Sequence, residues 1–573
     1  MECKQEFSIR YNHVGYGIGF PKIFYLAMPM GMDSRILEAS FKVVDENGSV
    51  TQAGKLAKRG DCAYTDETLF EGDFSDVTVP GKYKISVQVI AQDGANLFEG
   101  ESFFFDISDR WLESQLKANI KSFFFQRTGV ELPAEYAGKW ARPAAHLDDR
   151  LEFHRIMDRK GTWNAHGGWY DAGDYGKYIV NGGVSVATLL LACEMCREGD
   201  GIMGGEGFSP SFEQPYSLLD EVRFELEFFL RMQDEDGGVF FKVTPDHWDG
   251  FVTPEDSDVM QNRYIMGKST TSTLNFAGAL AQAHRVFKAA GGSENESFAT
   301  RCLAASLRAY RWALAHPDAD WPHNTEGSGG YGDEHVEDEF FWARAMLFRE
   351  IGASEFPQDG TDEALASLLE KDMMENPVQP ALSWRDTHNF GWIALALNDS
   401  AGDFAAKARN RARAEIEKAA DEILKLQEQD AYSLSIRRFV WGSNGEIANH
   451  ALTLLVAYSW TRDKRYRDAA VELVNFIYGR NPLNVSFVTG SAWSSPKFPH
   501  HRICHADGIV DPIPGLLVGG INSDRQDMHR KPSYPNDLPG FSYTDERCSF
   551  ASNETAINWN SPLTAVLAML RSL

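Results

Sequence analysis

Alternation of apolar and polar residues marks the first hundred residues of the chain. The stretches "KIFYLAM" (22–28), "ASFKVV" (39–44) and "GKYKISVQVI" (81–90) alternate or are rich in β-branched residues, as strands are. Turn-forming segments such as "DENGS" (45–49) separate them. The pattern over about residues 6–106 predicts an all-β sandwich of about 100 residues.

After "DISDRWLES" (106–114) the period of the apolar positions changes to about 3.6 residues, which predicts α-helices. Strong patterns cover 111–128, 180–198, 217–233, 271–289, 297–316, 338–351, 403–428, 445–461, 464–478 and 553–572, and weaker ones cover 362–371 and 388–398. Long loops at 129–179, 234–268, 317–337 and 479–552 separate some of these helices, and long loops in compact domains are usually functional. We therefore expect a β-sandwich at 1–107 and, at 108–573, a helical domain built as a closed ring of hairpins.

Charge and hydropathy narrow the possible partners of the protein. The 573 residues carry a formal charge of −26, which argues against nucleic acids and anionic membranes as partners. The chain has no run of 18 apolar residues that would predict a membrane-spanning helix. It begins without a basic region followed by an apolar run, so the sequence predicts a cytoplasmic protein.

The seven cysteines are scattered along the chain, which favours reduced thiols over a disulfide framework. Cys193 and Cys196 form a C-x-x-C pair inside the apolar run "VSVATLLLACEMC" (184–196). Because a zinc ribbon would need a second such pair, we interpret them as helix residues of the core.

Two aspartates lie three residues apart in "HGGWYDAGDYGKY" (166–178). Asp and Gly are common in turns, so one interpretation of Asp171 and Asp174 is purely structural. The other is chemical, because two close carboxylates can hold a water molecule and take a proton from it. The chemical interpretation requires an acid elsewhere in the chain to protonate a leaving group.

The stretch "YTDERCSFASNETAINWNSPL" (543–563) supplies a candidate for that acid in Glu554, which we expect to open the last helix. A lone glutamate at a helix start is usually there to match the helix dipole. This one lies among aromatic, acidic and amide residues at fixed spacings.

These motifs resemble glycoside hydrolase family 9. The "GGWYDAGDYGKY" stretch matches the aspartate motif of that family, and "YGRNPLNVSFVTG" (478–490) with "PHHR" (499–502) matches a second signature. "FVWGSN" (439–444), "DEFFWA" (338–343) and the N-terminal "IRYNHVGYG" (9–17) are also similar to family segments. The C-terminal signature is matched by Tyr543, Asp545, Phe550, Glu554, Ala556, Asn560 and Ser561.

The resemblance implies an all-α (α/α)6 barrel preceded by an immunoglobulin-like sandwich, and an inverting β-glycosidase. It assigns Asp174 as the general base, Asp171 as the residue that helps to hold the water, and Glu554 as the general acid. Inversion places the acid and the base on opposite faces of the sugar, about 6.5–9.5 Å apart. No cofactor is required for this chemistry.

The resemblance also implies which residues contact the substrate, a β-1,4-linked oligosaccharide. His500 and Arg502 match the sugar-contacting residues of the family and could donate hydrogen bonds to hydroxyl groups. Trp441 and Trp169 could stack on sugar rings, although tryptophans near a barrel mouth are as often packing residues. Trp559 is a further candidate for a contact with the substrate.

Metal sites of the family are matched only in part. Some relatives hold zinc with cysteines at positions where this chain has Thr128 and Ala145, so we expect no zinc. Asp338 and Glu339, with Asp386, resemble a family calcium site, and "YGDEHVEDE" (331–339) offers clustered oxygen donors. A solvated acidic loop is the alternative interpretation.

The predicted sugar specificity comes from a position at which this chain differs from most members of the family. Many family members have Asp-Tyr where this chain has Asn558-Trp559, which favours a non-cellulosic sugar. The acidic charge and the absence of a leader agree with exo-β-D-glucosaminidases acting on chitosan oligosaccharides, whose ammonium group Asp171 or Asp545 could bind. The alternatives are an endo-β-1,4-glucanase and a sugar-binding protein without catalysis.

Overall fold

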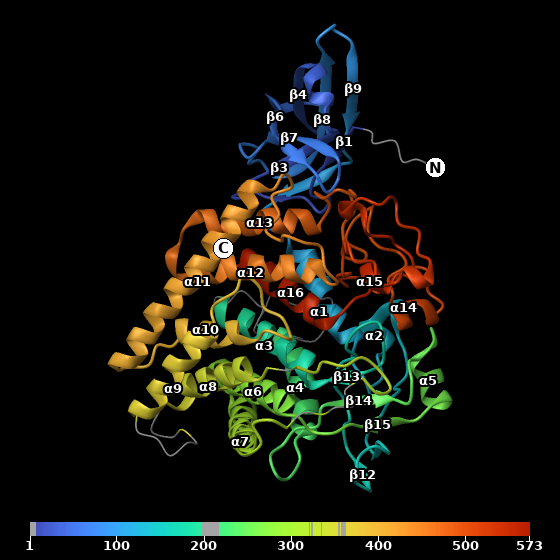
Figure 1. The fold of residues 1–573 in the computed structure, drawn as a ribbon. Helices are drawn as coiled ribbons and strands as arrows, with labels where there is room; N and C mark the ends of the chain where they lie inside the picture. The colour runs from blue at the N-terminus through green and yellow to red at the C-terminus, as the bar shows by residue number, and fades with distance from the viewer. Residues whose placement is uncertain are drawn as a thin grey trace.

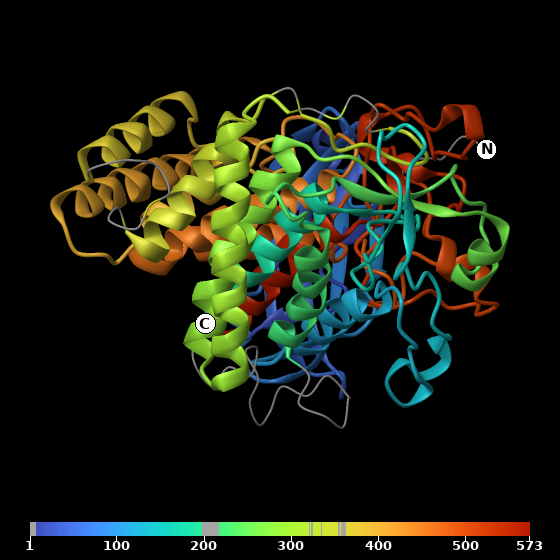
Figure 2. The same cartoon turned by 90° about the horizontal axis from the view of Figure 1, so that it is seen from below.

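The computed structural model describes residues 7–196, 217–319, 321, 325–333, 335–352, 356 and 362–573. Figure 1 shows a β-sandwich on top of a larger helical domain. In Figure 2 the same molecule is seen from below, with the helices in front of the sandwich. Cys3 and Glu334, which entered the sequence predictions, lie outside the described residues.

Two sheets form the sandwich. In the first, the strands lie in the order β1 (Ser8–Arg10), β3 (Ile23–Pro29), β7 (Glu67–Asp73) and β6 (Ala57–Cys62). In the second, the order is β2 (Tyr16–Gly17), β10 (Phe105–Ser108), β8 (Gly81–Ala91), β4 (Ile36–Asp45) and β5 (Val50–Lys55), and β9 (Asn96–Glu101) also pairs with β8. The inward residues of both sheets, among them Phe24, Phe41 and Ile85, form one buried cluster. The alternation in the sequence therefore predicted this part correctly.

The helices follow in the predicted order, and most of their ends lie within four residues of the prediction. The long helices are α1 (Glu113–Phe125), α3 (Ile179–Met195), α4 (Leu218–Met232), α6 (Thr270–Ala290), α7 (Ser293–Ala315), α8 (Glu337–Ile351), α9 (Asp362–Glu375), α10 (His388–Ala396), α11 (Asp403–Gln429), α12 (Ser443–Thr461), α13 (Lys464–Ile477) and α16 (Ile557–Arg571). Local signals fix several ends: Ser217 and Asp220 form a capping box at α4, and Gly291, with φ +69°, ends α6.

Contacts between helices run in a cycle. Helix α3 packs on α6, α6 on α8, and α8 on α10, while α12 packs on α16 and α16 returns to α3. Helix α11 contacts both α10 and α12 and so joins the two halves of the cycle. The other long helices pack outside it, α4 on α3, α7 on α6, α9 on α8, α13 on α12 and α1 on α16. Helix α3 is buried along almost its whole length, as a helix surrounded by neighbours must be.

The long loops contain short elements that the sequence patterns missed. A five-stranded sheet has the order β12 (Thr162–Trp163), β11 (Leu151–Phe153), β15 (Arg263–Ile265), β14 (Lys242–Pro245) and β13 (Lys177–Tyr178). Its strands of two to four residues are too short for a detectable period. The short helices are α2 (Ala134–Ala137), α5 (Pro254–Met260), α14 (Arg502–Ala506) and α15 (Phe550–Asn553), and the 3-10 turns are η1 (Met32–Arg35), η2 (Gly138–Trp140), η3 (Met528–Arg530) and η4 (Pro539–Phe541).

Buried polar contacts join the sandwich to the helical domain. The Asn12 side chain donates to Asn475 Oδ1 at 2.8 Å, and Tyr432 Oη donates to Glu67 Oε2 at 2.7 Å. The fully buried Arg480 lies over the Tyr25 ring, 4.6 Å from its centroid. Because such buried contacts need specific partners, they fix the orientation of the two parts.

One helix boundary differs from the prediction in a way that matters. Helix α16 begins at Ile557, and Glu554 lies before it in an extended conformation with φ −72° and ψ 155°. This segment pairs with the backbone at His500 and Gly519, and that pairing replaces the expected start of the helix.

Within the described part of the chain, the longest helices are too polar for any of them to span a bilayer.

Candidate active site

The loop before β13 and α3 holds the aspartate pair. Asp171 and Asp174 are 2% and 7% exposed, so both carboxyl groups are taken out of water. Gly173 between them lies against the C-terminal loop, and a Cβ atom there would be 2.1 Å from the carbonyl oxygen of His500. The glycine therefore lets the aspartate loop press directly on the backbone of a segment more than 300 residues away.

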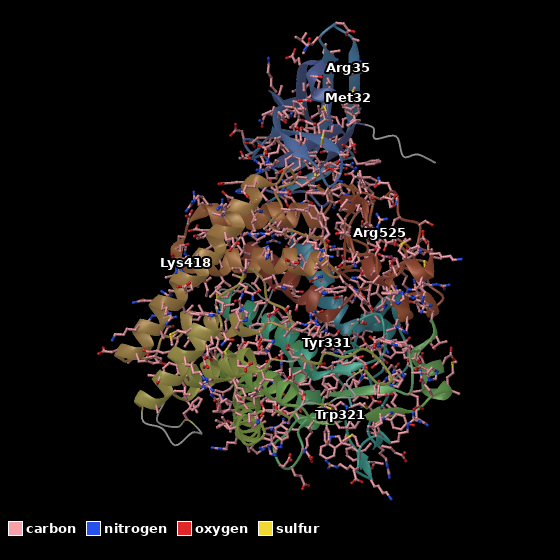
Figure 3. All side chains as sticks on the ribbon, in the orientation of Figure 1. Met32, Arg35, Trp321, Tyr331, Lys418 and Arg525 are labelled. Atoms are coloured by element: carbon pink, nitrogen blue, oxygen red, sulfur yellow. The ribbon has the colours of Figure 1, made fainter. Side chains whose placement is uncertain are left out.

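Two side chains hold the Asp171 carboxylate. Asn181, in the first turn of α3, donates to Oδ1 at 2.6 Å, and the Tyr331 hydroxyl donates to Oδ2. Figure 3 labels Tyr331, which comes from the loop between α7 and α8. Burial raises the pKa of Asp171 far above its ordinary value, and the nearby charge of Asp174 raises it further. This carboxyl group is fixed on both oxygens.

Asp174 has a different environment. Its Oδ2 accepts a hydrogen bond from the Gly176 amide at 3.1 Å and lies 3.4 Å from the Tyr178 hydroxyl. The pair thus consists of one carboxyl group held by side chains on both oxygens and one held by its own loop. Such unequal surroundings are typical of neighbouring carboxyl groups with different roles.

Glu554 faces this pair from the C-terminal segment. The Ile557 amide donates to the carbonyl of Asp171 at 2.9 Å, which ties the segment to the aspartate loop. Burial raises the pKa of Glu554 to about 8, the negative charge of Asp174 adds to the shift, and Arg502 opposes it. At neutral pH this carboxyl group is therefore mostly protonated and can act as an acid.

His500 and Arg502, which the resemblance assigns as sugar contacts, both already have protein partners. Arg502 Nη1 donates to Gly173 O at 2.8 Å and its Nε donates to Asp249 O at 3.0 Å. His500 Nδ1 lies 2.7 Å from Arg547 O, and burial lowers the pKa of His500 to about 4. In a neutral ring Nδ1 must donate to that carbonyl, which leaves Nε2 as an acceptor rather than the expected donor.

The three predicted tryptophans differ in accessibility and contacts. The prediction for Trp169 was wrong: it is fully buried and its Nε1 donates to Glu221 Oε1 at 2.8 Å, so its ring packs inside the protein. Trp441 is 42% exposed, and its side chain hydrogen-bonds Glu554. Trp559 is half-buried against the start of α12, where a Cβ atom on Gly442 or Gly445 would be 2.5 Å from its ring. Trp441 thus has free surface beside the acid, whereas Trp559 packs closely on the protein.

Sequence reasoning missed Asn181 and Tyr331 as partners of the aspartates. Asn181 follows the quoted motif by three residues, and a polar residue in the fully apolar turn "IVNGGV" (179–184) was a usable signal. Tyr331 belongs to an acidic stretch that suggested calcium, and no spacing relates it to Asp171. Only the folded position of the loop at 325–333 shows this contact.

Asp338, Glu339 and Asp386, the predicted calcium ligands, differ in their surroundings. Asp338 Oδ2 accepts hydrogen bonds from Thr387, whereas Asp338 Oδ1 and both oxygens of the buried Glu339 have no hydrogen-bond partner. The pKa of Glu339 is raised well above its usual value by burial and by the charge of Asp338. Asp386 Oδ2 lies 3.4 Å from the Ser383 hydroxyl. Within the described ranges, no three His, Cys, Asp or Glu side chains are arranged around one point as metal ligands.

The residues at the positions where some relatives bind zinc form hydrogen bonds within the protein. Thr128 Oγ1 donates to Gly167 O at 2.8 Å, and Ala145 O accepts from the Gly129 amide at 2.9 Å. His146 Nδ1 lies 2.7 Å from the Tyr170 hydroxyl. The absence of zinc stays a prediction.

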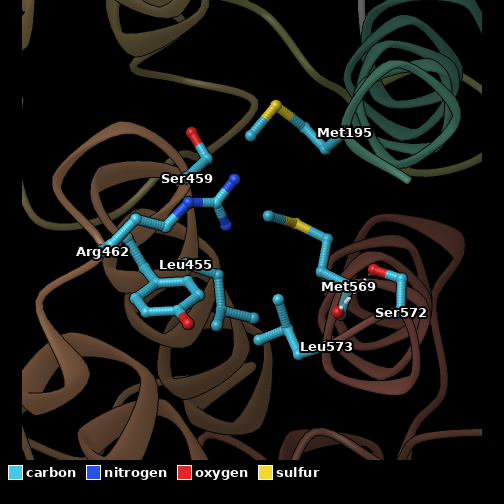
Figure 4. A pocket seen from close by; sticks show the side chains of 8 residues that line it. Met195, Leu455, Ser459, Arg462, Met569, Ser572 and Leu573 are labelled. Atoms are coloured by element: carbon cyan, nitrogen blue, oxygen red, sulfur yellow. Dashed lines mark hydrogen bonds between the residues drawn. The ribbon is translucent and has the colours of Figure 1, made fainter. Parts of the chain in front are cut away.

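A separate cavity of about 90 Å³ lies at the C-terminal ends of α3, α12 and α16. Figure 4 shows Arg462 pointing into it between Met195 and Met569. The carboxyl groups lie beyond the N-terminal ends of α3 and α16, so about 25 Å of helix separates the cavity from them. It is therefore not part of the same site.

Comparisons with known proteins agree with this geometry. Residues 113–567 match the model of glycosyl hydrolase family 9, and residues 4–92 match the cellulase N-terminal ig-like domain. The chain belongs to glycosyl hydrolase family 9. It is therefore a glycoside hydrolase, and family 9 enzymes act with inversion.

Two relatives and one solved structure match nearly all of the chain. A xyloglucan-specific endo-β-1,4-glucanase of Bacteroides ovatus is 35% identical over 99% of this chain and 94% of its own length. A cellulose 1,4-β-cellobiosidase of Acetivibrio thermocellus is 31% identical over 98% of this chain and 67% of its own length. The structure of a metagenome-derived family 9 endoglucanase superposes with a TM-score of 0.85 at 30% identity, covering 99% of both chains.

The contact between Gly173 and His500 gives a direct test of the site. We expect Gly173→Ala to lower kcat/KM at least about 100-fold, because the added Cβ must push the aspartate loop away from its position. Gly19→Ala is the control, since a Cβ atom there meets no atom within 4 Å. Near-normal activity of Gly173→Ala, with an unchanged melting temperature, would contradict the conclusion that the site depends on the close contact between Gly173 and His500.

Proposed function

We propose that the protein is an endo-β-1,4-glucanase that uses Asp174 as the general base and Glu554 as the general acid. The observation that carries this proposal is the placement of a half-buried Glu554, whose pKa is raised to about 8, on a segment joined to the loop of the buried aspartate pair. The endo specificity is supported by relatives named as endoglucanases, including the Bacteroides ovatus enzyme and endoglucanase D of Acetivibrio thermocellus.

In the proposed reaction, Glu554 gives its proton to the glycosidic oxygen as the bond to the anomeric carbon breaks. A water molecule on the opposite face attacks that carbon and loses a proton to Asp174. Asp171, held by Asn181 and Tyr331, accepts the other hydrogen of the water and orients it. The products are two shorter glucans, the new reducing end being the α-anomer.

The glucosaminidase specificity that the sequence suggested has little support. Asp545, one of the two candidate acceptors for an ammonium group, accepts hydrogen bonds from the Lys497 and Phe498 amides at 2.6 and 2.8 Å. It therefore holds the loop that leads to His500. Neither curated relative described above is named for glucosamine substrates.

We further infer that the helical domain is an (α/α)6 barrel. The contacts of α3, α6, α8, α10, α12 and α16 support an inner ring. Helix α11, which bridges α10 and α12, would join α1, α4, α7, α9 and α13 in an outer one. The aspartates and Glu554 precede α3 and α16, two neighbouring helices of the inner ring. One end of such a barrel would therefore carry the whole reaction.

The substrate is tested by comparing kcat/KM on xyloglucan, carboxymethylcellulose, cello-oligosaccharides and the glucosamine dimer. We expect a soluble β-1,4-glucan to be the best substrate, with a fast fall in viscosity because an endo enzyme cuts inside chains. Proton NMR of fresh products should show the α-anomer first. A preference for the glucosamine dimer, with release of single sugars, would overturn the glucanase in favour of the glucosaminidase.

Replacing the proposed acid should have an effect that depends on the leaving group. We expect Glu554→Gln to lower kcat on glucan by about 10²–10⁴-fold, and to affect an aryl glycoside with a good leaving group much less. The alkaline limb of the wild-type profile should lie near pH 8, because activity is lost as Glu554 deprotonates. Glu546→Gln, on the same loop, is the control; equal losses on both substrates would remove Glu554 from the acid role.

We also propose that calcium binds at Asp338 and Glu339. The support is the buried oxygens of these two carboxyl groups that lack hydrogen-bond partners, because hard oxygen donors without partners fit this cation. The ion would supply charge balance and hold the start of α8, away from the reacting bond.

If calcium binds there, a chelator should lower the melting temperature of the wild type by several degrees, and added calcium should restore it. Glu339→Gln should remove this dependence, whereas Glu370→Gln, at an exposed site on α9, should keep it. A melting temperature of the wild type that does not respond to calcium would exclude the proposed ion.

A further inference from the structure

One face of helix α1 is polar although it is buried. Asn119, Ser122 and Gln126 are three and four residues apart, so they share one side of the helix, and none is more than 3% exposed. Asn119 donates to the carbonyl of Gly515 at 2.8 Å, and Ser122 accepts from Asn560 of α16 at 2.6 Å. Figure 1 shows α1 beside α16. Because buried polar groups need partners, this face holds the C-terminal part of the chain in one place.

Gln126, at the end of α1, bridges the two loops of the site. Its Nε2 donates to the carbonyl of Ala172 at 3.1 Å, between the two aspartates. Its Oε1 lies 3.0 Å from His501 Nε2, in the segment at 500–502. The Gln126 carbonyl also accepts from the Tyr170 amide at 2.8 Å. One side-chain amide therefore contacts both of the segments that meet beside Glu554.

The hydrogen bonds of His501 fix which way this amide points. His501 Nδ1 accepts from the Cys504 amide at 3.3 Å, at the start of α14. Burial lowers the pKa of His501 to about 3, so the ring is neutral and its one proton is on Nε2. That Nε2 therefore donates to Gln126 Oε1, and the amide nitrogen of Gln126 faces Ala172 O, which can only accept. The bridge thus has a single arrangement of donors and acceptors.

We propose that Gln126 is a positioning residue for the reaction, because its side-chain amide holds the loop of the aspartates at a fixed place against the segment at 500–502. The inference rests on the proposed roles of Asp174 and Glu554. Gln126 acts through Ala172 and His501 and not on the reacting atoms. A displacement of reacting groups by about 1 Å can lower a rate on the order of 10²-fold, so a bridge of this kind matters to catalysis.

The first test is Gln126→Met, which nearly keeps the length of the side chain and removes both hydrogen bonds. We expect kcat on the best of the substrates compared above to fall about 30-fold and KM to change less than about threefold, because the carboxyl groups move while the rest of the cleft is kept. Rates are taken per folded molecule, with the folded fraction measured by circular dichroism at the assay temperature. A kcat within about twofold of the wild type would overturn the proposal.

Gln126→Glu tests the same bridge with a side chain of the same shape. The charged and titratable groups around this position are Asp171 and Asp174 on one loop, His501, Arg502 and Cys504 on the other, and Arg142, which donates to the carbonyls on either side of Gln126. Burial and the two aspartates raise the pKa of the introduced carboxyl group, and the two arginines oppose that shift. When it is protonated, this group can donate to Ala172 and accept from His501, as glutamine does.

The pH dependence of Gln126→Glu therefore separates a positioning role from a merely structural one. Its kcat should be about 30-fold below the wild type at pH 8, where the introduced carboxyl group is ionised and cannot donate, and within about threefold at pH 5. Gln126→Met should show the same ratio to the wild type at both pH values. A ratio for Gln126→Glu that does not rise toward low pH would overturn the proposal, even if Gln126→Met fails to fold.

Gln427, in the last turn of α11, provides a matched control. It is 6% exposed, and its Nε2 donates to the carbonyls of Ser433 and Ala469, both at 3.1 Å. Neither partner belongs to a loop of the site. Gln427→Met should lower the melting temperature, since it leaves two carbonyls without a donor, but it should keep kcat within about twofold. An equal loss of kcat in Gln126→Met and Gln427→Met would trace the loss to general destabilisation and overturn the proposal.

Asp174→Asn separates this inference from the proposed function. An active Asp174→Asn variant would refute the base assignment and, with it, the inference that depends on it. An inactive Asp174→Asn variant, together with a wild-type kcat in Gln126→Met, would refute only the role of Gln126.

Discussion

The close backbone contact between Gly173 and His500 is the constraint on which the site depends. Arg502 donates to the Gly173 carbonyl from both its amide and its guanidinium, and the His500 amide donates to Asn553 O at 2.8 Å. The backbone at 500–502 therefore holds the loop of Asp171 and Asp174 on one side and, through Asn553, the neighbouring Glu554 on the other. Side chains alone could not fix two distant segments this closely, because each carries rotamer freedom that the backbone contact lacks.

Burial of the carboxyl groups follows from that contact and sets their chemistry. Removing water raises the pKa of Glu554 and of Asp171, so the acid keeps its proton near neutral pH. The same burial would destabilise the ionised base if nothing compensated it. The Arg502 guanidinium opposes the rise in the pKa of the acid.

A buried ionic network supports the loop that carries Asp171 and Asp174. Asp148 accepts from Lys177 at 2.7 Å and from Arg263 at 2.9 Å, and Arg263 Nη1 donates to the carbonyl of Tyr175 at 2.7 Å. All three charged side chains are nearly inaccessible to water. Removing one member of such a network leaves uncompensated buried charge, so the loop is held in one arrangement. This rigidity suits a site whose carboxyl groups must face each other across a sugar.

The amino-acid sequence by itself determined the order of the elements, because the periods of two and 3.6 residues record which side of each strand or helix is buried. The sandwich strands and the long helices were found in this way, and the motifs around Asp171, Asp174 and Glu554 named the reacting groups. Tertiary structure alone decided the rest. Glu554 lies in an extended segment instead of a helix because pairing with His500 and Gly519 outweighs local preference. Likewise, Tyr331 reaches Asp171 from a loop without a regular pattern, so no spacing along the chain relates the two residues.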